Sequence, residues 1–122
     1  MSGDSTNGAL TVITQTCKPG EGPPPHIHQN EDEFFFVIEG EFELFDGKQW
    51  TKLPCHQCGC KMRGELHTFR NCGTTIGKIL CVITPGGLDE YLEAISTLSI
   101  PNDLETLANI SGKFGIRFVT SV

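Results

Sequence analysis

The sequence is poor in basic residues and contains no long apolar run. Nine Lys and Arg stand against fifteen Asp and Glu in 122 residues, which gives a formal net charge of -6. Because no cluster of Lys or Arg could neutralise a row of phosphates, nucleic-acid binding is not expected. No segment approaches the roughly 18 apolar residues of a membrane span, and residues 1–12 lack the basic start and apolar core of a signal peptide. We therefore expect a soluble, cytoplasmic protein that binds neither nucleic acid nor membrane.

Six cysteines would suggest a disulfide scaffold in a secreted chain, but since nothing indicates export we expect free thiols. Cys55, Cys58 and Cys60 form a C-x2-C-x-C pattern. It lacks a second cysteine pair at zinc-ribbon spacing, so a metal or redox site there is the weaker interpretation. Cys58 and Cys60 alternate with Met62, as small core residues on one strand face would. The same packing role is assigned to Cys72 and Cys81.

The composition favours a single all-β domain over residues 1–122. Fourteen Gly and seven Pro indicate many turns, while 38% hydrophobic and 20% charged residues are typical of a globular chain. Strands are predicted over 9–17, 34–38, 41–45, 48–53, 58–62, 66–70 and 75–84. A β-barrel or sandwich is therefore expected over about 9–86, followed by a mainly helical extension over about 87–122.

The Phe-rich segment 34–38 is the strongest strand signal. Its continuous apolar run predicts a strand buried on both faces. Gly40 permits a turn into 41–45, and Asp46-Gly47 predicts a two-residue hairpin into 48–53. The three strands are therefore expected to form a meander.

Two short helices are predicted after Gly87. Leu88, Tyr91, Leu92, Ile95 and Leu98 recur at helical spacing and predict a helix over about 88–98. Asn102 followed by Glu105 resembles a capping box and Gly112 a helix stop, so a second helix is expected over about 103–111. A final strand is predicted over 115–120.

Histidine and acidic residues gather between a Pro-rich loop and the Phe-rich strand. His26 and His28 are two apart, so in an extended chain both side chains face one centre. Glu33 enters an apolar strand, where a carboxylate is costly unless it is paired or binds a metal. With His67, these residues offer a mixed nitrogen and oxygen ligand set typical of Fe, Mn, Ni, Cu or Zn.

These residues resemble the cupins, whose first motif is G-x5-H-x-H-x4-E-x6-G. Gly20, His26, His28, Glu33 and Gly40 meet every spacing of that motif. The resemblance covers about residues 20–84. It implies a cupin double-stranded β-helix, or jelly-roll barrel, here followed by two short C-terminal helices.

The second cupin motif, G-x5-P-x-G-x2-H-x3-N, is matched at Gly64, His67 and Asn71. Met62 replaces its proline and His56 its leading glycine. In cupins the histidines and glutamate of the first motif and the histidine of the second bind one divalent transition metal. The resemblance therefore assigns His26, His28, Glu33 and His67 as metal ligands.

Other residues near the motif have simpler interpretations. Glu31 and Asp32 are rival carboxylates, but only Glu33 keeps both the x4 spacing from His28 and the x6 spacing to Gly40. Asp32 fits a looser version of the motif, with x3 after the second histidine. His56 is expected to be a structural histidine.

The metal ligands carry the functional hypothesis, because the fold hosts unrelated activities. We expect a metal-dependent dioxygenase that acts on a small aromatic or enolic substrate, in which Glu33 also takes a substrate proton. Phe35, Val37 and the cysteine and methionine strand are expected to line the pocket. A metal-dependent isomerase or lyase and a non-catalytic small-molecule-binding protein remain the alternatives.

A homodimer is expected from the strand pattern. Phe34, Phe36 and Ile38 lie on the side opposite Glu33, so the strand is apolar on both faces. One face fills the barrel, and the other must be covered by the helices, a second sheet or another subunit. The resemblance favours a subunit, since cupins commonly pair in homodimers.

Overall fold

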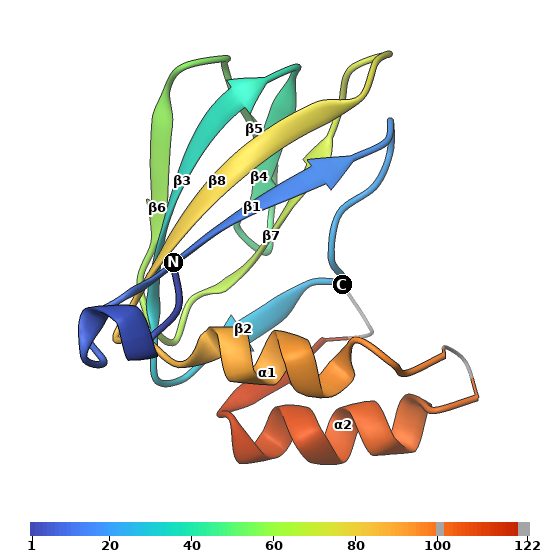
Figure 1. Cartoon of the computed structure of the whole chain (residues 1–122). Helices are drawn as coiled ribbons and strands as arrows, with labels where there is room; N and C mark the ends of the chain where they lie inside the picture. The colour runs from blue at the N-terminus through green and yellow to red at the C-terminus, as the bar shows by residue number, and fades with distance from the viewer. Residues whose placement is uncertain (100–101, 120–122) are drawn as a thin grey trace.

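Two antiparallel sheets face each other in the computed structural model, which describes residues 1–99 and 102–119 (Figure 1). A 3-10 helix, η1 (Asp4–Thr6), precedes the strands. One sheet has the order β1-β8-β3-β6 and the other β5-β4-β7-β2-β9. The strands of the first sheet are β1 (Thr11–Cys17), β3 (Asp32–Glu39), β6 (Cys58–Lys61) and β8 (Gly77–Thr84). Those of the second are β2 (His26–His28), β4 (Phe42–Phe45), β5 (Trp50–Leu53), β7 (Leu66–Asn71) and β9 (Ile116–Phe118).

The predicted all-β class with two short C-terminal helices is confirmed, but the sheets stay separate. Among the described residues no strand pairing joins one sheet to the other, so hydrogen bonds do not close them into a barrel. No helix in the same part of the chain is long and apolar enough to cross a membrane.

The core lies between the sheets and is built from alternate residues of β3 and β8. Phe35 and Val37 are at most 1% exposed, as are the inward residues of β8, which are Ile79, Cys81 and Ile83. Phe34 points outward and is 42% exposed. The expectation that 34–38 is buried on both faces is therefore wrong, because an apolar run shows which residues could be buried and not which faces are covered.

The predicted three-stranded meander is also wrong. β3 pairs with β8 and β6, whereas β4 pairs with β5 and β7. Gly40, at φ +87°, turns the chain from one sheet to the other, and a Cβ there would lie 2.9 Å from the Cα of Gly77. Only the β4–β5 hairpin of the expected meander exists. The residue pair nearest its turn is Phe45 and Trp50, so the connecting loop has four residues and not the predicted two.

The C-terminal helices lie at the lower end of the sheets in Figure 1, next to β2. α1 (Leu88–Ile95) ends before the predicted Leu98, and α2 (Leu104–Lys113) continues past Gly112. Asp103 caps α2 without a side-chain hydrogen bond, so the capping box predicted there is absent. The chain turns at Gly115 instead, at φ +74°, and β9 then pairs with β2. Residue 120 of the predicted final strand lies outside the described residues.

Candidate metal site

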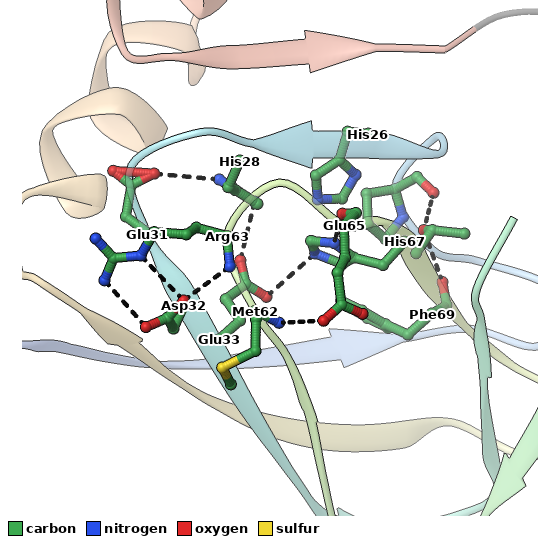
Figure 2. Close-up of polar contacts among 12 residues, drawn as sticks. His26, His28, Glu31, Asp32, Glu33, Met62, Arg63, Glu65, His67 and Phe69 are labelled. Atoms are coloured by element: carbon green, nitrogen blue, oxygen red, sulfur yellow. Dashed lines mark hydrogen bonds and ion pairs between the residues drawn. The ribbon is translucent and has the colours of Figure 1, made fainter.

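Three strands from two sheets bring the predicted site residues together. His26 and His28 lie on β2 and His67 on the neighbouring β7, where His26 and His67 are direct cross-strand partners. Glu33 reaches them from β3 in the facing sheet (Figure 2). All four side chains are buried, and one ligand atom from each lies within 4.8 Å of the others. The cluster is compatible with a metal ion.

Backbone carbonyls orient two of the imidazoles. Nδ1 of His26 lies 2.7 Å from the carbonyl oxygen of Pro24, and Nδ1 of His67 lies 3.0 Å from that of Glu65. If each Nδ1–H donates to its carbonyl, each Nε2 keeps a free lone pair, as in histidines that bind metals through Nε2.

Glu33 joins the histidines from the opposite side. Its Oε1 lies 3.0 Å from Nε2 of His28, and its Oε2 lies 3.8 Å from Nε2 of His67. Nε2 of His67 is buried without a hydrogen-bond partner, and such an atom is costly to bury unless a further group meets it. The donor set and this unpartnered nitrogen fit a divalent transition metal.

Charge interactions within the cluster set its proton distribution. Burial, followed by repulsion from His67, lowers the pKa of His26 to about 4. Burial also disfavours charge on His28, but contacts with Glu31 and Glu33 outweigh it and raise the pKa of His28 to about 9. Burial likewise opposes charge on Glu33, yet the hydrogen bond from His28 and electrostatic attraction to the His28 and His67 imidazoles lower its pKa to about 2. Near neutral pH the site therefore holds a protonated His28 beside an ionised Glu33.

Metal binding near pH 7.5 is expected to release about one proton per ion, which comes from His28. The raised pKa of His28 keeps its ring charged until about pH 9, whereas His26 is already neutral above about pH 4. Affinity should therefore rise about tenfold per pH unit and level off near pH 9. Isothermal titration in buffers with different enthalpies of ionisation measures the released protons. Binding without proton release would show that His28 is not the protonated ligand.

The rival residues lie at the edge of the cluster. Asp32 accepts hydrogen bonds from the guanidinium of Arg63 at 3.0 and 3.1 Å and from its backbone N–H at 2.7 Å. Glu31 Oε1 lies 3.4 Å from Nδ1 of His28, at ion-pair distance but without hydrogen-bond geometry. His56 is exposed and stacks on Phe36. Of the acidic residues considered, the structure brings Glu33 into the cluster.

The cysteine strand does not line the site as predicted. Cys55, Cys58 and Cys60 are exposed, and Met62 is 39% exposed. Cys58 and Cys60 are paired with Phe36 and Phe34, whose side chains point outward from β3. The two cysteines therefore share one strand face, as predicted, but that face is the outer one and not the core face. Of the two remaining cysteines assigned to packing, Cys81 is buried and Cys72 is half-buried.

Replacing Cys55, Cys58 and Cys60 together with Ser is expected to leave metal content unchanged. Cys58 and Cys60 lie on β6 opposite Phe36 and Phe34, Cys55 is exposed in the loop before β6, and none of the three belongs to the buried cluster. Thiol titration of the denatured wild type should count six reduced cysteines, since all six are free in the structure. Loss of metal in the triple variant, measured by elemental analysis, would make C-x2-C-x-C a functional motif.

A cavity of about 850 Å³ extends from the α1 and α2 helices to the buried cluster. We call the part of the cavity lined by the two helices its helical end. His26, His28 and Glu33 line the cavity. Phe35, Val37 and the cysteine and methionine strand, predicted as its lining, do not. Its apolar walls come from β1, β7, β9 and both helices, including Ile13, Phe69, Leu88, Leu92, Ile116 and Phe118. The sequence signal that could have located it is the apolar stripe of the first predicted helix, four of whose residues line the cavity.

Comparison with known proteins decides the family. The family model described as Cupin domain matches residues 13–83, which is more than half of the chain. The chain belongs to the cupin family. No curated protein matches this cupin.

Solved structures of other proteins share the fold. A predicted oxalate decarboxylase from Thermotoga maritima is 25% identical, with a TM-score of 0.63, covering 68% of this chain and 73% of that one. A cupin-superfamily sugar phosphate isomerase from Silicibacter pomeroyi is 27% identical, with a TM-score of 0.60, covering 67% and 55% respectively. KdgF from Halomonas sp. is 18% identical, with a TM-score of 0.62, covering 68% and 74%, and shows the fold alone.

Proposed function

We propose that this cupin is a metal-dependent dioxygenase that acts on an aromatic or enolic substrate. The observation that carries the proposal is the buried cluster of three imidazoles and one carboxylate at the inner end of an apolar cavity. His26, His28, Glu33 and His67 would hold one divalent ion, namely Fe, Mn, Ni, Cu or Zn. Such an ion, when bound, supplies a positive centre that chelates an enolate or phenolate and, if redox-active, exchanges electrons with dioxygen.

The chain's own residues prepare the substrate. The apolar walls offer water few partners, so a substrate that fills the cavity would displace water and strengthen the electrostatic interactions at the cluster. Glu33 is the carboxylate of the cluster that lies at the cavity wall, so it is the group placed to accept a proton from a substrate hydroxyl. A substrate that enters as a neutral enol or phenol would thereby become the anion that chelates an ion.

Dioxygen uptake tests the proposal. Protein loaded with iron or manganese should consume dioxygen with at least one of a catechol, a flavonol and a 1,3-diketone, as measured with an oxygen electrode. Glu33→Gln should abolish the uptake at equal metal content, whereas Glu39→Gln, at an exposed glutamate of the same strand outside the cluster, is the matched control and should keep it. If metal-loaded protein takes up no dioxygen but NMR detects substrate proton exchange, the metal-dependent isomerase or lyase is supported. Binding without either reaction would support a non-catalytic role.

We also propose that the protein is a cytoplasmic homodimer joined through the outer face of the first sheet. Strand register places Phe34, Phe36, Leu80 and Val82 on that face. Among the described residues α1 and α2 pack at the end of the sheets and leave this face uncovered. A contiguous apolar sheet face is characteristic of an interface between subunits. The free thiols fit a reducing compartment.

Light scattering is expected to give about twice the 13.3 kDa of one chain at micromolar concentration. Phe34→Glu should shift this mass to that of a monomer, because a carboxylate would be buried without a partner in the interface. Ile76→Glu removes an exposed apolar side chain outside the strands, 56% exposed, and serves as the control that stays dimeric. A wild-type mass near that of one chain would refute the dimer.

A further inference from the structure

We infer that the cavity binds the long apolar body of an amphiphilic ligand whose polar, chelating head lies at His26, His28 and Glu33. The inference deepens the proposed function, and its polar end rests on that function. It enlarges the substrate from a small enol or phenol to one with an extended alkyl or aryl tail. The tail would lie between the C-terminal helices and the sheets.

The size of the cavity is the first argument. Its volume of about 850 Å³ is near the upper end of the roughly 300–1,000 Å³ typical of pockets for drug-sized molecules. A one-ring substrate held at the histidines would leave most of this space without a partner. A ligand that also fills the helical end would bury far more apolar surface.

The walls at the helical end are apolar. Leu92 and Ile95 of α1 and Leu107 of α2 line the cavity together with Ile13 and Phe118 of the two sheets. Leu92 and Ile95 also pack against the core, whereas Leu107 is half-buried and belongs only to the cavity wall. Leu104, 57% exposed, lies at the start of α2 and continues the apolar lining toward solvent.

The polar side chains of the walls outside the cluster are few, and two of them already hydrogen-bond each other; they are Gln15, Gln29, Tyr91, Ser111 and Arg117. The hydroxyls of Tyr91 and Ser111 are hydrogen-bonded to each other at 2.7 Å, so they already satisfy one another. Arg117 is the one lining residue with a permanent positive charge among the described residues, and it is exposed. A phosphate usually needs several donors or cations, and a sugar needs many hydrogen-bonding partners. The walls therefore suit an apolar tail better than a sugar phosphate.

The cavity also connects its apolar end with a polar end. His26, His28 and Glu33 line the same space as Leu92 and Leu107, so one ligand can contact both groups. A molecule that is apolar throughout would leave the buried histidines and carboxylate without new partners. A chelating head joined to an apolar tail satisfies both ends.

Alkyl hydroxamates of increasing length test the inference, since they keep one chelating head and vary only the tail. Acetohydroxamic, hexanohydroxamic and decanohydroxamic acids would be titrated calorimetrically, below micelle-forming concentrations, into zinc-loaded protein and into chelator-stripped protein. Affinity for the loaded protein should rise about fourfold per methylene that enters the cavity, and therefore by about two orders of magnitude from the hexano to the decano compound.

Variants on α2 identify the tail site. Leu107→Asp should weaken decanohydroxamate binding at least tenfold and leave acetohydroxamate binding unchanged. Thr106→Asp, its exposed neighbour outside the cavity wall, is the matched control and should behave as wild type. If circular dichroism shows that Leu107→Asp does not fold, Ile95→Asp on α1 replaces it.

The possible outcomes distinguish a failure of the tail-binding inference from a failure of the metal proposal. Equal affinity for all three lengths, with acetohydroxamate still bound, overturns the inference and leaves the metal proposal intact. A rise with length in both loaded and stripped protein supports the apolar site even if the metal proposal fails. A rise with length that Leu107→Asp and Ile95→Asp both leave unchanged in folded protein places the tail elsewhere and overturns the inference.

Discussion

Purified protein is expected to hold about one transition metal ion per chain, and the His26→Ala and His67→Ala double variant is expected to hold none. The two imidazoles are cross-strand partners, and Nε2 of His67 is a buried atom without a hydrogen-bond partner. Loss of outer groups around a metal typically weakens binding by about 10–100-fold, and loss of two ligands should cost considerably more. The remaining His28 and Glu33 would then pair with each other, as they already do at 3.0 Å.

Elemental analysis after gentle purification measures the ion, and reloading followed by competition with a chelator measures its affinity. His56→Ala is the matched control, because it removes an exposed imidazole outside the cluster. Its metal content should equal that of the wild type. A double variant that retains as much metal as the wild type, or a wild type that can neither retain nor take up an ion, would contradict the ligand assignment.

Only part of the cluster could be predicted from local spacing in the sequence. The two-residue periodicity of an extended chain is enough to direct His26 and His28 to one side. Glu33 and His67 were candidates by residue type and position, but they come from other strands that no local rule joins to β2, so the resemblance to cupins was needed to assign them. The structure now places all four side chains together, and their role as ligands stays a prediction.

The errors in the fold arise from contacts between residues distant in sequence. A meander was expected because β3 and β4 are adjacent in the chain and Gly40 permits a turn. The turn instead moves the chain to the facing sheet, and β3 pairs with β8, about forty residues later. Sequence patterns indicate strands well but do not choose the partners of a strand.

Faces and cavities were harder to predict for the same reason. Phe34 and Cys60 belong to strands with the expected alternation, but which side is covered depends on the other sheet. The sequence predicts the apolar stripe of the first helix but does not show which part of the protein the stripe faces. The position of this stripe beside the buried histidine and glutamate cluster depends on how α1 and α2 fold back over the ends of β1 and β2, which sequence periodicity does not specify.

Asn71→Leu is expected to lower the free energy of unfolding by about 3–5 kcal/mol. The Asn71 side chain is 1% exposed and makes three hydrogen bonds to backbone groups. Its Nδ2 donates to the carbonyls of Cys17 at 2.9 Å and Thr75 at 2.8 Å, and its Oδ1 accepts from the N–H of Gly73 at 2.8 Å. Leucine would fill similar space and leave these three groups unpaired, at about 1–3 kcal/mol for each group that water cannot reach.

Urea unfolding followed by Trp50 fluorescence measures the change, with Asn102→Leu as the control at an exposed asparagine. The effect should be confined to stability. Asn71 joins the end of β1 to the turn between β7 and β8, and its polar contacts involve none of the four cluster residues. Folded Asn71→Leu protein should therefore take up metal as the wild type does. A loss below about 1 kcal/mol would mean that the three backbone groups find other partners, and reduced metal affinity in the folded variant would tie Asn71 to the site itself.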